Sequence, residues 1–139
     1  MKTVQSGFTL MELMIGVIIV TILATVAIPS FSKAIERTKV KDAQTTLAAV
    51  YSSEKIYRLD QLSYGTLANL VANNYIADPD PSDNNPNWNF GTSGVTASAF
   101  TATATRTGGS YDTKTVAVTE AFDGTPYAGG TNPHPLRDQ

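Results

Sequence analysis

The chain has 139 residues, a net charge of −2, 42% hydrophobic residues and no cysteine. This length fits one compact domain with an appendage. The near-neutral charge gives no bulk electrostatic argument for binding nucleic acid or anionic membranes, and the lack of cysteine excludes disulfides, thiolate metal sites and cysteine nucleophiles. The single histidine, His134, lies between two prolines in the tail, where we expect it to be solvated. Because the carboxylates form no catalytic motif either, we predict no catalytic residues and no enzymatic activity.

The N-terminal region combines a short polar leader, residues 1–7, with an apolar run over residues 8–28. At 1.5 Å per residue, a helix over this run would cross a bilayer core of about 30 Å. The alternative is a secretory signal peptide cleaved after the small residues at 25–27. The apolar stretch of such signals is usually shorter, roughly 7–15 residues.

Glu12 is the one charge in the apolar run, and it has no basic neighbour, because Lys2 is upstream and Lys33 lies beyond the span. A carboxylate inside a bilayer costs about 2.5–3.5 kcal/mol on insertion scales, so it is rarely placed there without a partner. One interpretation is a protonated glutamate near a membrane face. The other is that cleavage between Gly7 and Phe8 creates an amine one helical turn away, which neutralises Glu12 within a subunit or between neighbours.

Residues 7–13 read GFTLMEL, which resembles the class III signal of type IV prepilins and type II secretion pseudopilins. In that family a polar leader ends in Gly, followed by Phe and by a Glu five residues into the mature chain. The resemblance implies that the prepilin peptidase cuts after Gly7 and methylates the amine of Phe8. It also implies that Glu12 pairs with the N-terminus of a neighbouring subunit during assembly. Met11 stands where the family often has Ile or Val, which changes shape but not chemistry.

The same resemblance implies where the chain acts. The precursor would be a single-pass inner-membrane protein with a cytoplasmic N-terminus. The pilus assembly machinery of that membrane would then add it to an extracellular filament of identical copies. A positive-inside count predicts the opposite orientation, since four basic residues follow the span: Lys33, Arg37, Lys39 and Lys41. We follow the more specific motif.

Beyond the apolar run the helical pattern continues. Pro29 removes one hydrogen bond and crowds the carbonyl of Thr25, so we expect a kink there. A helix from Phe8 to about Leu62 would be roughly 80 Å long. Its first half has no soluble core to bury in, so we expect it to pack on other copies after leaving the membrane. Its second half is amphipathic, with one face formed at spacings of three and four by Val40, Ala43, Leu47, Val50, Glu54 and Tyr57.

The C-terminal half predicts a short helix or turn within residues 66–76, with Thr66 as its N-cap and Asn73-Asn74 as its end, and strands at 88–90, 100–105 and 115–119. Three antiparallel strands with one apolar face need a cover, which the amphipathic helix supplies. The predicted fold class is α+β, with a long N-terminal helical spine, membrane-spanning in its first half, packed on a small antiparallel β-sheet head. The predicted divisions are a cleaved leader at 1–7, a transmembrane and filament-core helix at 8–29, and the amphipathic helix plus head at 30–139.

Four aspartates raise the question of calcium. Asp78, Asp80 and Asp83 are spaced like oxygen ligands, and Asp123 lies near the last strand; major pseudopilins commonly hold calcium in the head. No acidic loop here matches an ordered twelve-residue calcium motif, and aspartates before prolines are ordinary turn formers. We therefore expect a surface loop, no metal site and no cofactor, with calcium as the weaker alternative.

The remaining features concern the head and its tail. Residues 61–139 carry three basic and seven acidic residues, a balance of −4, so we expect no nucleic acid to bind the isolated head. Many pilins close a C-terminal loop with a disulfide. Without cysteine, residues 122–139 must be held by another device or remain loose.

The predicted function is that of a structural pilin, a subunit of a type IV pilus-like filament. A pseudopilin of a type II secretion system is the alternative in the same class, and a defined calcium site in the head would favour it. A secreted or membrane-anchored binding module is a second class of function. It would use the N-terminus only for targeting and would give Glu12 no role.

Overall fold

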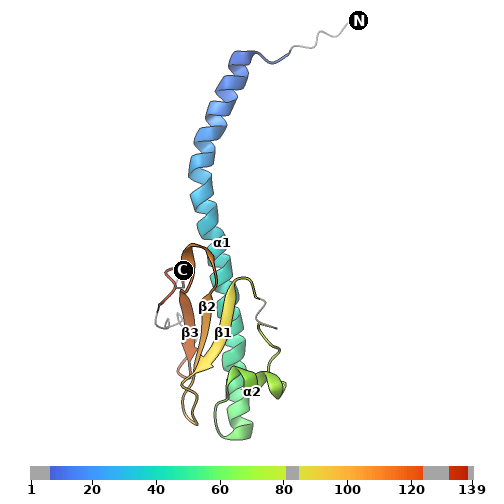
Figure 1. Cartoon of the computed structure of the whole chain (residues 1–139), viewed down its shortest axis with the longest axis vertical. Coiled ribbons are helices and arrows are strands. Elements are labelled where there is room, and N and C mark those ends of the chain that lie inside the picture. The colour runs from blue at the N-terminus through green and yellow to red at the C-terminus, as the bar shows by residue number, and fades with distance from the viewer. Residues whose placement is uncertain (1–6, 81–84, 124–131, 138–139) are drawn as a thin grey trace, which may run out of the picture. The chain divides into compact units, whose positions relative to one another are not determined.

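The computed structural model of the chain describes residues 7–80, 85–123 and 132–137, without the side chains of residues 26–30 (Figure 1). The chain divides into two compact units, Met1–Ile35 and Glu36–Gln139. Helix α1, Leu10–Gln61, contributes residues to both units, and the other described helices and strands belong to the second.

The first unit is the beginning of α1. Thr9 caps this helix, because its Oγ1 accepts the N–H of Glu12 at 3.2 Å and its carbonyl accepts the N–H of Leu13 at 3.2 Å. The carboxylate of Glu12 in the first turn is also favoured by the helix dipole. The residues at 26–30 are helical, but the side chain of Pro29 lies outside the described residues, so the kink stays a prediction.

Large apolar side chains of the first unit are uncovered. Phe8 is 83% exposed, Leu10 81% and Leu23 65%. Among the described residues, no helix combines the length and the apolar character that crossing a membrane requires. The structure therefore does not show the span predicted over residues 8–29.

In the second unit, α1 buries the predicted face. Val40, Leu47 and Val50 are each 1% exposed, and Glu54 on the same face is fully buried. The helix ends at Gln61, and the next residue, Leu62, has a positive φ of 59°. Its N–H donates to the carbonyl of Arg58 at 2.9 Å, which closes the last turn in the left-handed manner usually reserved for glycine.

Helix α2, Leu67–Ala72, follows a short connection. The predicted N-cap is confirmed, since the Oγ1 of Thr66 accepts the N–H of Asn69 at 3.2 Å. The last residue of the helix is Ala72 and its C-cap is Asn73, so the predicted end at Asn73-Asn74 is confirmed. Asn74 takes a positive φ of 59°, a conformation that asparagine tolerates better than most residues.

The sheet has the order β1-β2-β3 with antiparallel pairing throughout. Its strands are β1 (Trp88–Ser93), β2 (Thr101–Arg106) and β3 (Thr115–Thr119), with a 3-10 turn at Gly109–Tyr111 between the last two. Phe90 pairs with Ala104, which pairs with Val116, so one inward-facing row crosses all three strands. Strand β1 is longer than predicted, because the residues after Phe90 pair with the first half of β2.

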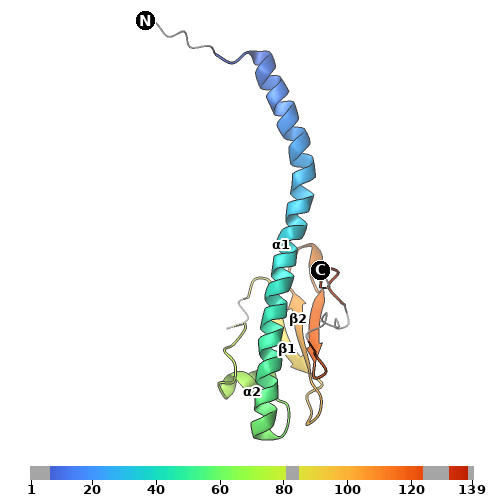
Figure 2. The same ribbon diagram turned by 180° about the vertical axis from the view of Figure 1, so that it is seen from behind.

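The apolar face of the sheet packs on α1, as Figures 1 and 2 show from opposite sides. Two alanines of the central strand, Ala102 and Ala104, are almost completely buried and leave room for the helix. The indole N–H of Trp88 donates to the carbonyl of Lys39 at 3.0 Å, which fixes β1 to the helix backbone. The predicted α+β fold class, a long N-terminal helix packed on a small antiparallel sheet, is confirmed.

We expect Ala104→Leu to destabilise the head by about 1–3 kcal/mol, because the added side chain must enter a closely packed interface. Urea unfolding of the full chain in detergent micelles measures this change. Thr103→Leu, one residue away on the opposite face of β2, is the matched control and should change stability by less than about 0.5 kcal/mol. Equal effects of the two substitutions would contradict the packing described.

Candidate functional site

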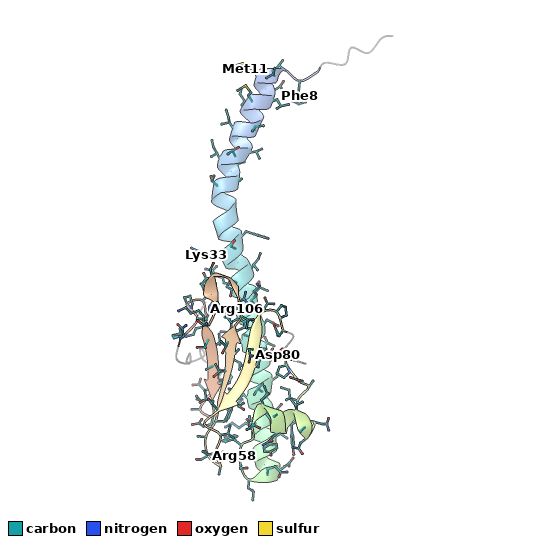
Figure 3. All side chains as sticks on the ribbon, in the orientation of Figure 1. Phe8, Met11, Lys33, Arg58, Asp80 and Arg106 are labelled. Carbon is teal, nitrogen blue, oxygen red and sulfur yellow. The ribbon has the colours of Figure 1, made fainter. Side chains whose placement is uncertain are left out.

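The predicted cleavage site lies just before the first helix. Gly7 and Phe8 are exposed and outside regular secondary structure, and no neighbouring atom lies within 4 Å of a Cβ placed on Gly7. Figure 3 shows Phe8 at the beginning of α1. A peptidase can reach an exposed peptide bond outside regular secondary structure, so the local structure suits the predicted cut.

Phe8 and Glu12 share one groove. Both border an apolar hollow along the first turns of α1, and Gly16 leaves part of this surface without a side chain. Among the residues that the structure describes, Glu12 takes part in no ion pair. Cleavage, methylation of Phe8 and pairing by Glu12 stay predictions, but the residues they require lie together. The hollow is completed by Leu13, Val17, Val20 and Thr21.

Two of the aspartates considered for calcium, Asp78 and Asp80, act as turn formers. The Oδ1 atom of Asp78 accepts the N–H of Asp80 at 3.0 Å, and the Oδ1 atom of Asp80 accepts the N–H of Asn85 at 2.7 Å. Asp83 lies outside the described residues, and Asp123 is exposed. Within the described ranges, no three metal-ligating side chains come together.

The head contains a buried ionic cluster that the sequence analysis missed. Glu36 of α1 accepts from Arg106 of β2, with its Oε1 at 2.8 Å from Nε and its Oε2 at 3.3 Å from Nη2. His134 of the tail lies on the same carboxylate, with Nε2 at 3.2 Å from Oε1. Glu36 is 7% exposed, Arg106 5% and His134 0%. We call these three residues the Glu36 cluster.

The expectation of a solvated His134 is therefore wrong. Its backbone N–H donates to the carbonyl of Thr115 at 2.8 Å, and the N–H of Thr115 donates to the carbonyl of Asn132 at 2.7 Å. These bonds lay the tail along the edge of β3, with a parallel bridge between Thr115 and Pro133. The side-chain amide of Gln44 further holds the carbonyl of Arg137 at 2.6 Å. This is the device that fastens residues 132–137 without a disulfide.

A local signal for the Glu36 cluster did exist on the helix. Glu36 precedes Val40 by four residues and thus continues the buried face toward the N-terminus. A carboxylate on an apolar face needs a cationic partner. The identity of that partner could not be read from the sequence, because Arg106 is 70 residues away and His134 is 98 residues away.

The charges of the cluster decide its protonation. Burial by itself would raise the pKa of Glu36, but the hydrogen bonds and positive charge of Arg106, and then His134, lower it overall. Burial lowers the pKa of His134, against the attraction of Glu36, and the charges of Arg106 and Lys114 add to the lowering. The Nδ1 of His134 accepts the N–H of Leu136 at 3.2 Å, so this nitrogen carries no proton and the neutral ring donates through Nε2.

A second buried carboxylate fastens the connection after α1. Glu54 is fully buried, and its Oε2 accepts the N–H of Gly65 at 2.9 Å, whereas its Oε1 has no partner in the described structure. Burial raises the pKa of Glu54, and the bond from Gly65 offsets part of this effect. A side chain at Gly65 would meet the ring of Tyr57, since a Cβ there would lie 2.9 Å from it.

Comparison with known proteins gives two matches to family models. The model described as "Prokaryotic N-terminal methylation motif" matches residues 2–28. The model described as "Type IV minor pilin ComP, DNA uptake sequence receptor" matches residues 29–115, more than half of the chain. The chain belongs to the type IV pilin family. The predicted family is thereby confirmed, and this pilin is a structural subunit of the pilin and pseudopilin class.

Individual relatives agree with this assignment. The pilin is 46% identical over 65 residues to "Type IV major pilin protein PilA" of Myxococcus xanthus, covering 47% of this chain and 30% of that protein. It is 34% identical over 86 residues to "Type II secretion system core protein G" of Pseudomonas aeruginosa, covering 61% and 59%. It is 55% identical over 42 residues to "Type IV major fimbrial protein FimA" of Dichelobacter nodosus, covering 30% and 26%. The matches thus span between about a quarter and three fifths of these relatives. No solved structure matches the pilin.

We expect the tail to loosen as the pH falls below about 6.5, the ordinary pKa of His134. Because the folded-state pKa is lower, the unfolded chain binds more protons in this range. The stability contributed by the neutral ring is complete above pH 6.5 and is lost as the pH falls toward the folded-state pKa. The stability contributed by ionised Glu36 is complete above pH 4.5, its ordinary pKa. It is lost as the pH falls through the lower pKa that Glu36 has in the folded state. Hydrogen exchange at the amide of Thr115, corrected for intrinsic rates, measures this loosening between pH 7.5 and 5.

His134→Gln supplies the control for this prediction. The substitution removes the only histidine of the chain, so protection of the Thr115 amide should become nearly independent of pH between about 5.5 and 7. Protection that falls equally in wild type and His134→Gln would show that another group controls the tail.

Proposed function

We propose that this pilin is the precursor of a pilus-like extracellular filament. The chain inserts in the inner membrane through residues 8–29, is cleaved after Gly7 by the prepilin peptidase and methylated at Phe8, and polymerises through its N-terminal helix. The observation that carries the proposal is the contrast between the two units. The first exposes its large apolar side chains, whereas the second buries a complete core. An apolar surface of this extent requires lipid before assembly and other copies afterwards.

The groove at the start of α1 supports a specific assembly contact. Cleavage after Gly7 would place a new amine on Phe8, beside the groove that also contains the carboxylate of Glu12. In a dry helix bundle an amine and a carboxylate attract strongly, and each would otherwise be buried unpaired. Gly16 allows a neighbouring helix to approach closely, as small residues do in membrane bundles. Pairing of Glu12 with the N-terminus of a neighbour therefore satisfies both charges.

A type II secretion pseudopilin is the second candidate within the same class, and the similarity to secretion core protein G supports it. We favour the pilus, because the family model over residues 29–115 and two of the three relatives above are described as pilins or fimbrial proteins. Recovery of the subunit in filaments sheared from the cell surface would support the pilus.

The matching family model is described as that of a DNA uptake sequence receptor. We do not propose DNA binding as the main function of the present head. Residues 61–139 carry three basic and seven acidic residues, and the affinity of proteins for DNA depends chiefly on neutralising phosphate charge.

We expect Gly7→Glu to block processing, so that no chain beginning at Phe8 is recovered. We expect Glu12→Gln to be processed normally but to yield at most about one tenth of the wild-type amount of filaments. A loss of about 1.4 kcal/mol per contact suffices for a tenfold change. The mass and the N-terminal residue of protein in the sheared and membrane fractions measure both effects. A wild-type chain that begins near Ile28 would instead show ordinary secretion.

Thr9→Val tests whether the loss of filaments in Glu12→Gln comes from lost pairing or from a weakened start of α1. This substitution removes the hydroxyl that caps α1 and leaves the carboxylate in place. If pairing matters, Thr9→Val should assemble far better than Glu12→Gln. Normal filaments from Glu12→Gln, or equal losses in both variants, would contradict the pairing role.

A further inference from the structure

Within the described part of the second unit, Glu36–Gln139, the exposed large apolar side chains occupy one short stretch. Ile56 is 52% exposed and Leu59 80%, both near the C-terminal end of α1, and Leu62, directly after the helix, is 83% exposed. Single exposed leucines need no explanation. A cluster of them at one end of a unit whose other large apolar side chains are covered marks an interaction surface.

Two cations lie among these leucines. Lys55, Arg58, Leu59 and Leu62 border one hollow, which we call the tip patch. Figure 3 marks its place by Arg58. The Nζ of Lys55 and the Nη1 of Arg58 both donate to the phenol oxygen of Tyr64, at 3.1 and 3.2 Å. These contacts hold both cations in place without neutralising them, and neither forms an ion pair with a carboxylate in the described structure. A partner for the tip patch should therefore be apolar and acidic.

The head itself carries a surface of this description. A second hollow between α2 and β1, which we call the acidic groove, has an apolar floor and two aspartates, Asp78 and Asp80. The Oδ1 atom of each aspartate accepts a hydrogen bond from a backbone N–H, and the Oδ2 atom takes no part in these two bonds. In Figure 3, Asp80 lies beside β1 and Arg58 at the end of α1, so the two surfaces are separate. The floor is formed by Leu67, Ala68, Val71, Ala72 and Phe90.

We propose that the tip patch of one copy docks into the acidic groove of a second copy. Leu59 and Leu62 fill the apolar floor, while Lys55 and Arg58 face Asp78 and Asp80. Because the two surfaces differ, the contact is heterologous and leaves a free patch and a free groove at its ends, so it extends into a chain of subunits rather than closing a pair. The inference rests on the proposed filament function and adds a contact between heads to it.

The leucines favour a second copy over DNA as the partner. Two cations are a small electrostatic footprint for a polyanion, and phosphates on Lys55 and Arg58 would leave Leu59 and Leu62 in water. The acidic groove, in contrast, offers cover for both leucines and opposite charge for both cations.

Disulfide trapping tests the contact directly, because the chain contains no cysteine. Filaments of a Leu62→Cys, Ala68→Cys double variant should give a ladder of cross-linked multimers on a non-reducing gel, since a disulfide forms only when the two Cα atoms come within about 7 Å. A Leu62→Cys, Thr107→Cys double variant pairs the patch with an exposed position away from the groove and should give no ladder. A missing ladder for the first pair, or equal ladders for both, would overturn the proposal.

Charge reversal supplies an independent test on the full chain in its host. Arg58→Asp and Asp78→Arg should each reduce sheared filaments about tenfold, and the combined variant should recover to within about threefold of wild type. Leu59→Asp, at an exposed position that leaves the core intact, should reduce filaments like Arg58→Asp. Lys41→Asp, an exposed cation of α1 outside the patch, is the control and should assemble normally. Normal filaments from Arg58→Asp and Leu59→Asp, or no recovery in the combined variant, would overturn the contact.

Two further results separate this inference from its alternatives. If wild-type chains in filaments begin at Phe8 and the patch variants form as many filaments as the wild type, the head contact fails while the filament function stands. If wild-type chains begin elsewhere and form no filaments, the proposed function fails. If Arg58→Asp leaves filaments intact but abolishes their retention of double-stranded DNA at about 50 mM salt, the patch is a DNA site and the docking proposal is overturned.

Discussion

The carboxylate of Glu36 is the point where helix, sheet and tail of the head are joined. It accepts from Arg106 of β2 and from His134 of the tail, and none of the three residues is more than 7% exposed. A buried ion pair adds little net stability compared with an apolar pair of equal volume. Removing one partner, however, costs about 3–5 kcal/mol, because the remaining charge is left buried and unpaired. The cluster therefore fixes which segments meet more than how tightly they pack. The single negative charge of Glu36 and the single positive charge of Arg106 balance only while the imidazole of His134 is neutral, which is why we expect the tail to respond to pH.

The buried face of α1 carries a carboxylate at each end, and each end fastens a different segment. Toward the N-terminus Glu36 holds β2 and the tail, and toward the C-terminus Glu54 holds the N–H of Gly65 in the connection to α2. Between them α1 packs on the sheet through apolar side chains such as Leu47, with the hydrogen bond from the indole of Trp88 to the carbonyl of Lys39 beside them. The apolar stripe supplies the free energy of packing, since burial scales with apolar area, and the two carboxylates set the register of the segments around it. A chain without cysteine thereby obtains a defined head.

Local patterns predicted the parts of this molecule that depend on neighbours in sequence. The three- and four-residue spacing from Val40 to Val50 identified the buried face, and Thr66 identified the start of α2. The N-terminal motif was visible for the same reason, because it lies in consecutive residues, and a family model of the methylation motif matches residues 2–28; cleavage between Gly7 and Phe8 stays a prediction. The burial of His134 was not predictable in this way, since its partners are 98 and 19 residues away on α1 and β3. Strand β1 was underestimated because Gly91 interrupts the alternation, and pairing with β2 overrides that weak local preference.

The two kinds of contact proposed for the filament differ in strength and role. Uncovered apolar side chains along the first unit give a large, weakly directional attraction, because lipid-like surfaces slide and rotate with little change in energy. A contact between the tip patch and the acidic groove is smaller but directional, because two charges and two leucines must each find their counterparts. Once the N-terminal helices hold two copies together, the second contact forms within a tethered pair, where the effective concentration is in the millimolar range for short links. A head contact too weak to be seen between free subunits would then be sufficient to set the angle between successive copies in the filament.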